Sequence, residues 1–301
     1  MKSFLSTISP TSLRSSLLNT NQSNVKLIDA TWFMPNSPRN AIKEFKQIRL
    51  PNSKYFNLDK YIDEESKYPH MLPKLSVMNK AFSELGVSKI DILVVYDKSG
   101  IFSSPRAAWQ FSLYGHPKVY LLDNYLSYLK CEYPVEETEV QEIKQENSKY
   151  EGISEFEFNK NYSDQVIEYE ELIDLVKNNQ TDNYTIIDAR SKERFSGEAP
   201  EPRPGLSSGH VPNAKNLPFT NVLTGDDLKN FKSSDEIVKE FENAGIDLNK
   251  DIIVMCGTGV TAVILKFAIE KIKKDAKIRV YDGSWTEYAS RAPKEYIIKD
   301  N

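Results

Sequence analysis

The run DIIVMC at residues 251–256 follows the pattern of DILVVY at residues 91–96, which stands 160 positions earlier. Two further pairs keep almost the same spacing of 159 positions: VKLIDA at 25–30 with YTIIDA at 184–189, and VYLLDN at 119–124 with IRVYDG at 278–283. Three matches in one order and at nearly one spacing indicate that the chain contains two copies of one domain.

Each of these runs is short, apolar and rich in β-branched residues, as is typical of strands buried on both faces of a parallel sheet. Helical patterns lie between them, over residues 78–85, 105–114, 169–177, 235–244 and 261–273. Alternating strands and helices predict an α/β fold, in which right-handed crossovers connect the strands of a mainly parallel sheet flanked by helices.

Length and composition fit two such domains, because 301 residues with 40% hydrophobic and 27% charged side chains are typical of a globular chain. Residues 135–164 are rich in Glu, Lys, Gln and Asn and show little apolar periodicity. We therefore expect a linker there, between a first domain at 1–134 and a second at 165–301.

The net charge of −4 disfavours nucleic acid or an anionic membrane as a direct partner. No apolar run has the roughly 18 residues that a membrane span needs. The first 20 residues lack the apolar core of a secretory signal, which predicts a cytoplasmic location, with a mitochondrial one as the alternative.

The chain has two cysteines, Cys131 and Cys256, and three histidines, too few and too scattered for a disulfide framework or a zinc site. We therefore expect no metal and no cofactor. Cys131 begins the polar stretch without basic or glycine-rich surroundings, so we expect an incidental surface thiol there.

Cys256 ends a predicted strand and opens the loop CGTGVT at residues 256–261, which leads into a predicted helix. Two glycines allow a tight turn whose backbone N–H groups point at one centre, and the helix N-terminus adds the positive end of its dipole. Such a loop stabilises negative charge on sulfur, and the thiolate is the nucleophilic form of cysteine. A buried cysteine in an ordinary strand–helix turn is the alternative that the loop alone leaves open. The matching loop of the first copy, YDKSG at 96–100, has no thiol, which suits a duplicated enzyme with one working site.

This loop, the segment SGHVP at 208–212, the stretch YDGSW at 281–285 and the duplication itself resemble the tandem rhodanese family over essentially the whole chain. The resemblance implies two rhodanese-like domains and a sulfurtransferase that carries sulfur on Cys256 as a persulfide. Thiosulfate sulfurtransferases of the family typically have cationic residues in the loop, whereas the neutral Gly-Thr-Gly here is similar to the 3-mercaptopyruvate branch. A dianion needs more positive charge than a monocarboxylate does. We therefore expect 3-mercaptopyruvate as the main donor, thiosulfate as a weaker one, and pyruvate as the product.

The resemblance also implies roles for individual residues. Arg194 and Arg203 lie in a stretch similar to the one that supplies the family's carboxylate-binding arginines, and two guanidinium forks suit an α-keto carboxylate. The alternative for both is an ordinary surface ion pair with a neighbouring glutamate. Arg190 is expected to be structural, together with Asp188. The residues expected to bind the donor are Arg194, Arg203, Gly257, Gly259, Val260 and Thr261.

A proton relay is expected from a second set of residues. Asp59 and His70 match the segments whose Asp and His act with a loop serine in the 3-mercaptopyruvate enzymes. This chain has Thr258 in place of that serine, and a threonine hydroxyl can carry the same proton. A loop histidine satisfied by the local backbone is the alternative for His70.

Two other functions compete with sulfur transfer. Phosphatases of this fold need an arginine six positions after the cysteine, where this chain has Ala262. A non-catalytic binding or regulatory protein is the other, since the first copy has no nucleophile. The chain also resembles fungal sulfurtransferases of tRNA thiouridine modification. That resemblance implies a thiol or protein acceptor, such as an E1-like and ubiquitin-like sulfur carrier system, with no direct contact to RNA.

Overall fold

The computed structural model describes residues 4–19, 24–140, 146, 149–225 and 230–300. By their contacts, these residues form two compact units. The first unit consists of the described residues among 4–63, 72–161 and 225–230, and the second of those among 64–71, 162–224 and 231–300. The short segment 64–71, which carries His70, thus belongs to the second unit although it lies in the first half of the sequence.

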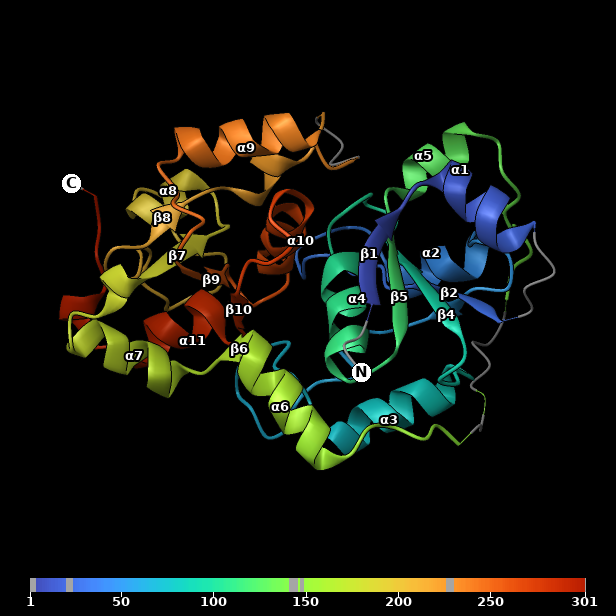
Figure 1. The fold of residues 1–301 in the computed structure, drawn as a ribbon, viewed down its shortest axis with the longest axis horizontal. Helices are drawn as coiled ribbons and strands as arrows, with labels where there is room; N and C mark the ends of the chain where they lie inside the picture. The colour runs from blue at the N-terminus through green and yellow to red at the C-terminus, as the bar shows by residue number, and fades with distance from the viewer. Residues whose placement is uncertain (1–3, 20–23, 141–145, 147–148, 226–229, 301) are drawn as a thin grey trace. The chain divides into compact units, whose positions relative to one another are not determined.

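The first unit is built on a five-stranded parallel sheet with the strand order β1-β5-β4-β2-β3, in which all strands but β3 are labelled in Figure 1. The strands are β1 (Phe4–Ile8), β2 (Val25–Asp29), β3 (Lys54–Tyr55), β4 (Ile92–Tyr96) and β5 (Lys118–Leu122). The helices are α1 (Pro10–Ser12), the π-helical η1 (Leu13–Leu18), α2 (Ala41–Gln47), α3 (Leu75–Glu84), α4 (Ser104–Leu113) and α5 (Tyr125–Lys130). Helices α1, α2 and α5 cover one face of the sheet, and α3 and α4 cover the other.

The second unit repeats this arrangement, with a five-stranded parallel sheet in the order β6-β10-β9-β7-β8. Its strands are β6 (Val166–Ile167), β7 (Tyr184–Asp188), β8 (Lys215–Asn216), β9 (Asp251–Met255) and β10 (Ile278–Tyr281). Its helices are α7 (Tyr169–Lys177), α8 (Lys192–Ser196), α9 (Ser234–Asn243), α10 (Ala262–Ile272) and α11 (Ser284–Arg291), with 3-10 turns η2 (Thr181–Asn183), η3 (Phe219–Val222) and η4 (Lys294–Tyr296). The shared strand order confirms the predicted repeat and the parallel α/β fold.

Strand register places the repeat at 159 positions in every strand except β3 and β8, which are 161 positions apart. Asp29 pairs with Tyr96 in the first unit, and Asp188 pairs with Met255 in the second. The expected match of residues 91–96 with 251–256 is therefore wrong by one position, and Asp97, not Tyr96, corresponds to Cys256. The cause is a shared Asp-Ile pair of letters: Asp91 precedes strand β4, whereas Asp251 is the first residue of β9.

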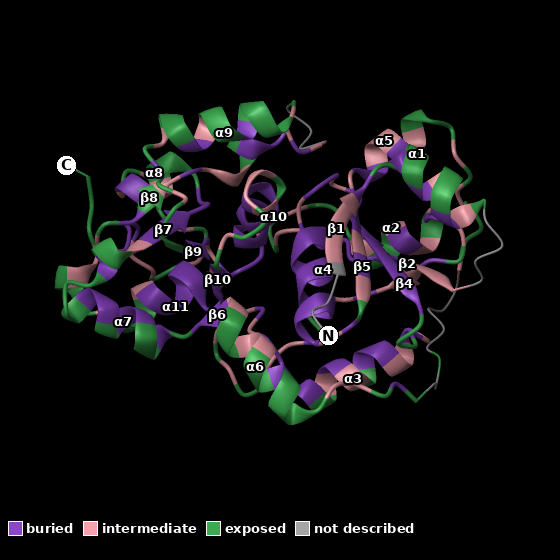
Figure 2. Cartoon of the chain, viewed as in Figure 1, coloured by how far each residue is buried: buried purple, intermediate pink, exposed green. Residues whose placement is uncertain are grey.

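The central strands are apolar on both faces because helices cover both sides of each sheet. All five residues of β4 are buried, as are Ile252–Met255 of β9 (Figure 2). In the second unit, α7 and α11 pack their apolar faces on one side of the sheet, where Trp285 is fully buried. Parallel pairing of β9 with β7 and with β10 sets the carboxyl ends of these strands side by side, and the candidate site lies at that edge.

Residues 135–164, expected to be a linker, contain the first part of helix α6 (Glu155–Gln165). Phe158 is the buried residue of this helix, and its ring stacks on Tyr114 of the first unit at 4.7 Å between centroids. One buried side chain in eleven positions leaves almost no apolar periodicity for a sequence pattern to detect.

Among the described helices, none combines the length and the apolar character that crossing a membrane requires.

Candidate active site

Cys256 directly follows β9, and its side chain is buried, with 2% of its surface exposed. The loop that it opens connects β9 to α10, so the thiol lies at the carboxyl edge of the sheet. Crevices at this edge of open α/β sheets are the usual position for ligands. The described residues include no group of three or more His, Cys, Asp or Glu side chains arranged to hold a metal ion.

Hydrogen bonds to the first residues of helix α11 fix the backbone of the cysteine loop. Trp285 N–H donates to the carbonyl of Cys256 at 2.9 Å, and both the N–H and the hydroxyl of Thr286 donate to the carbonyl of Gly257, at 3.0 and 2.7 Å. Ser284 Oγ accepts the N–H of Cys256 at 3.1 Å. These bonds occupy the carbonyls on the inner side of the loop and fix the position of the cysteine.

The corresponding loop of the first unit has a glycine of positive φ at the equivalent position but carries a carboxylate in place of the thiol. Gly100 and Gly259, which are 159 positions apart, both have positive φ angles, 107° and 73°. Asp97 takes the place of Cys256, and its carboxylate is completely buried. It accepts four backbone N–H groups, those of Ser99, Phe102, Ser103 and Ser104, at 2.8 to 3.0 Å, together with the Ser104 hydroxyl.

The hydrogen bonds to the Asp97 carboxylate indicate which kind of group this loop can bind. The carboxylate oxygens of aspartate are two bonds from Cβ, and the outer sulfur of a cysteine persulfide is two bonds from Cβ as well. At the same spacing of 159 positions, the amides that bind Asp97 correspond to those of Thr258, Thr261, Ala262 and Val263. The amides around Asp97 therefore bind a negative charge two bonds from Cβ, which is the position that an outer sulfur on Cys256 would take in the second unit.

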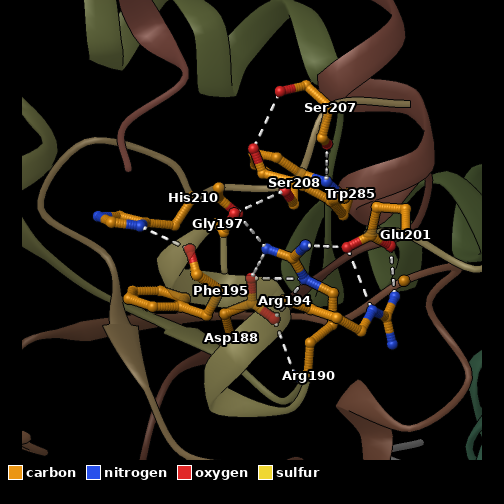
Figure 3. Close-up of polar contacts among 12 residues, drawn as sticks. Asp188, Arg190, Arg194, Phe195, Gly197, Glu201, Ser207, Ser208, His210 and Trp285 are labelled. Atoms are coloured by element: carbon orange, nitrogen blue, oxygen red, sulfur yellow. Dashed lines mark hydrogen bonds and ion pairs between the residues drawn. The ribbon is translucent and has the colours of Figure 1, made fainter. Parts of the chain in front are cut away.

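Arg194, in the middle of the short helix α8, lies against the cysteine loop. A Cβ atom placed on Gly257 would lie 3.2 Å from Nη2 of Arg194, so glycine at this position makes room for the guanidinium group. The same arginine is paired with Glu201, through Nε at 3.1 Å and Nη2 at 2.5 Å (Figure 3). The expected alternative, an ion pair with a neighbouring glutamate, is thus present, and it coexists with contact to the loop.

Glu201 joins Arg194 to a second, buried arginine. Its Oε1 accepts Nη1 of Arg190 at 2.7 Å, and Arg190 in turn binds Asp188 through Nη2 at 2.5 Å and Nε at 3.0 Å. Arg190 also donates to the carbonyl of Gly209 and stacks on Trp285, 4.2 Å from the ring centroid (Figure 3). Burial lowers the pKa of Arg190, but the two carboxylates raise it more, so the net pKa shift is upward.

Arg203 belongs to the same electrostatic neighbourhood. Burial lowers the pKa of its guanidinium group, and the positive charge of Arg194 lowers that pKa further. The charges of Glu201 and Cys256 act in the opposite direction and raise it. The structure therefore places Arg203 within electrostatic reach of Arg194 and Cys256, while Arg194 lies against Gly257 of the cysteine loop.

The structure also brings two of the three predicted relay residues together. His70 and Thr258 are both buried, and Nδ1 of His70 lies 3.2 Å from Oγ1 of Thr258. Either atom can donate, according to the tautomer of the ring. Asp59 lies in the first unit, where its carboxylate accepts Nε1 of Trp32 at 3.1 and 3.0 Å, and its part in the relay stays a prediction.

Several residues that shape the site were missed by sequence reasoning. Glu201 is one of two glutamates in the stretch between Arg194 and Arg203, and no local pattern distinguishes it from Glu198. Asp97 was missed because the repeat was aligned one position out. A comparison of the two loops from their glycines, Gly100 and Gly259, would have found it.

Comparison with known proteins agrees with this geometry. Residues 168–291 match the model of the rhodanese-like domain. The thiosulfate sulfurtransferase Tum1 of Saccharomyces cerevisiae is 39% identical over 284 residues, which cover 91% of each chain. The mitochondrial thiosulfate/3-mercaptopyruvate sulfurtransferase 1 of Arabidopsis thaliana is 37% identical over 91% of this chain and 74% of its own length.

A solved structure extends the likeness to the whole fold. The crystal structure of Tum1 from Saccharomyces cerevisiae superimposes with a TM-score of 0.91, at 36% identity, over 99% of both chains. The strand order, the duplicated unit and the relatives at this level of identity lead to one family. The chain belongs to the thiosulfate/3-mercaptopyruvate sulfurtransferases, enzymes with two rhodanese-like domains that transfer sulfur from a donor to an acceptor.

Proposed function

We propose that this enzyme carries sulfur as a persulfide on Cys256 and takes it mainly from 3-mercaptopyruvate. The observation that carries the proposal is the pair of matching loops. In the first unit, four amides and one hydroxyl bind the carboxylate of Asp97. The same loop around Cys256 would offer the amides of Thr258, Thr261, Ala262 and Val263 to the outer sulfur of a persulfide anion.

In the first half of the reaction, the thiolate of Cys256 attacks the sulfur of the donor. An S–S bond forms, the C–S bond of 3-mercaptopyruvate breaks, and the electron pair of that bond leaves on carbon as the enolate of pyruvate. The proton of the donor thiol ends on this carbon, so that thiolate and mercaptopyruvate give persulfide and pyruvate. With thiosulfate, the same attack releases sulfite. Preorganised amides that meet charge as it develops are the largest source of acceleration in many enzymes.

Donor binding and proton transfer fall to the surrounding side chains. Arg194 and Arg203 would hold the carboxylate, with Gly257, Gly259, Val260 and Thr261 forming the wall of the loop around the sulfur. Thr258 and His70, 3.2 Å apart, would move the thiol proton, with Asp59 as the third member of the relay. A positioned acid–base pair of this kind contributes about 100-fold or more to a rate.

A thiol or a protein would accept the outer sulfur in the second half of the reaction. The resemblance to the sulfurtransferases of tRNA thiouridine modification supports an E1-like and ubiquitin-like carrier system as that acceptor, with a role in tRNA thiolation through protein partners. The negative net charge of −4 supports the absence of direct contact with nucleic acid or membrane. We propose a cytoplasmic enzyme; the mitochondrial relative in Arabidopsis supports a mitochondrial form as the alternative.

Replacement of Arg194 by lysine tests the donor site, because lysine keeps the charge but loses the fork that a carboxylate needs. We expect kcat/KM for 3-mercaptopyruvate to fall about 10- to 100-fold, and kcat/KM for thiosulfate to change far less. Arg39→Lys is the matched control, at an exposed ion pair with Glu44 in the first unit, and should leave both donors unchanged. Equal losses on the two donors in Arg194→Lys would remove this arginine from carboxylate binding.

A further inference from the structure

Glu201 binds Arg194 along one edge of the guanidinium group. Its two oxygens accept Nε at 3.1 Å and Nη2 at 2.5 Å, which is the side-on edge. The end-on edge, formed by Nη1 and Nη2, is the second face at which a guanidinium group can bind a carboxylate in two-point fashion. Because the guanidinium group is rigid, the bonds from Glu201 to Nε and Nη2 also fix the direction in which the Nη1/Nη2 edge points.

Glu201 is itself held in place by the buried residues behind it. Its side chain is 3% exposed, against 24% for Arg194, and Arg190 and Asp188 are almost completely buried. Arg190 is fixed by four partners: Asp188, Glu201, the carbonyl of Gly209 and the ring of Trp285. The partly exposed Arg194 is thus the outer end of a chain of alternating charges anchored at strand β7 (Figure 3).

The first unit has the same turn without this chain of charges. Thr31 N–H donates to Asp29 Oδ1 at 2.9 Å, and Arg190 N–H donates to Asp188 Oδ1 at 2.9 Å, at the same position of the repeat. A threonine stands in the unit that lacks the thiol, and an arginine in the unit that has it. Arg190 is therefore not required by the fold that the two units share, which points to a functional role for it in the unit that carries Cys256.

The charges of the group also bear on the type of donor. Asp188 offsets the charge of Arg190, and Glu201 offsets that of Arg194. Within this group of four residues plus Arg203, one positive charge is left over beside the cysteine loop. A net charge of one positive unit matches a monoanionic donor better than a dianionic one. Loss of the negative charge of Glu201 would raise this net charge and favour the dianionic donor.

From these contacts we propose that Glu201 is a positioning and specificity-determining residue, which aims the end-on edge of Arg194 at the carboxylate of the donor and limits the positive charge of the site. The inference rests on the proposed role of Arg194 in carboxylate binding. Gly257 leaves room for this guanidinium group, since a Cβ there would press on Nη2 of Arg194.

Glu201→Gln tests the inference, because the amide keeps the shape and removes the charge. We expect KM for 3-mercaptopyruvate to rise about 10-fold while kcat changes by less than about threefold. The activity with thiosulfate should stay level or rise, so that the ratio of the two kcat/KM values moves at least about 10-fold toward thiosulfate. Glu198→Gln is the matched control: the same charge change in the same segment, at an exposed position, should leave this ratio unchanged.

A double variant with Arg194→Lys separates this inference from the proposed function. If Glu201 acts through Arg194, then Glu201→Gln adds little to the donor ratio once Arg194 is already lysine. Parallel losses on both donors in Glu201→Gln, with a donor-selective loss in Arg194→Lys, would overturn the role of Glu201 alone. If Arg194→Lys shows no selectivity, the proposed carboxylate site is wrong instead.

A second pair of variants keeps the test decisive if Glu201→Gln does not fold, which thermal unfolding will show. Glu201→Asp keeps the charge on a shorter arm, and we expect it to retain the donor ratio better than the amide does. Gly257→Ala should raise KM for 3-mercaptopyruvate about threefold or more, because its Cβ forces Arg194 to move. An unchanged donor ratio in Gly257→Ala would contradict the inference, and a shift toward thiosulfate would support it.

Discussion

Thr258 stands where the resembling 3-mercaptopyruvate enzymes have a serine, and its hydroxyl lies 3.2 Å from Nδ1 of His70. The methyl group of threonine restricts rotation about χ1, so the hydroxyl has fewer directions available than that of serine. His70 has a positive φ of 62°, an unusual backbone conformation for a residue with a side chain. Both side chains are buried, so the contact between them has a fixed geometry, as the proposed proton path requires.

Variants of Thr258 test that path. Thr258→Val keeps the shape of the side chain and removes the hydroxyl, and we expect the rate of pyruvate release in a single turnover to fall about 100-fold. Thr258→Ser should keep most of the rate, since it retains the hydroxyl. Single-turnover rates with and without an acceptor thiol would separate this step from the second half of the reaction. A valine variant as fast as wild type would exclude Thr258 from the relay.

Asp29 gives a prediction about pH and stability in the first unit. Burial raises the pKa of its carboxyl group to about 6, although hydrogen bonds from Thr31 lower that pKa. The folded protein therefore holds this proton more tightly than the unfolded chain does, and the contribution to stability is lost as pH rises from about 4 to about 6. In Asp29→Asn, the free energy of unfolding should decline less over this pH range, and the difference from wild type should be about 3 kcal/mol at most. Denaturant unfolding at several pH values measures the slope, and parallel profiles for variant and wild type would contradict the assignment.

At the scale of elements, one unit of strand, loop and helix occurs twice with different chemistry. In β9, the loop and α10, the strand ends in a thiol; in β4, the loop and α4, it ends in Asp97. The carboxylate satisfies amides of the first turn of α4 and of the loop, which otherwise have no partner inside a helix. The first unit thus fills its own anion site, and this explains why the copy without a thiol keeps the loop.

Removal of the Asp97 carboxylate tests this explanation. Asp97→Ala leaves buried amides without their acceptor, and we expect the free energy of unfolding to fall by about 3 kcal/mol or more. Formate, a carboxylate small enough to enter the vacated position, should raise the melting temperature of the variant more than that of wild type. Equal shifts for the two proteins would show that the loop does not bind the anion.

The elements that sequence reasoning found are those with strong apolar patterns. The five predicted helices correspond to α3, α4, α7, α9 and α10, because each buries a regular apolar stripe or is apolar on most sides. Helix α6, with Phe158 as its buried residue, and the short α8 carry no such pattern. Arg194 was found through the family motif, whereas Glu201 was not, because its role depends on a contact with Arg190 that only the folded chain creates.

At the scale of the whole molecule, duplication has given two units that share one strand order but differ in the residue that opens the loop. The unit with Asp97 has its anion site closed by its own side chain, while the unit with Cys256 has a neutral thiol loop, two arginines and a histidine–threonine pair around it. The charge chain from Asp188 to Arg194 is confined to that second unit by the Arg190 position, where the first has Thr31. We therefore propose that all of the sulfur chemistry takes place at Cys256.

The chain itself provides the control for this assignment, since Cys131 is an exposed free thiol and Cys256 a buried one. The most direct measurement is peptide mass spectrometry after incubation with 3-mercaptopyruvate in the absence of an acceptor. We expect the Cys256 peptide to gain the mass of one sulfur atom in step with pyruvate release, the Cys131 peptide to stay unchanged, and Cys256→Ser to release no pyruvate. Pyruvate release without added sulfur on Cys256, or by Cys256→Ser, would contradict the account.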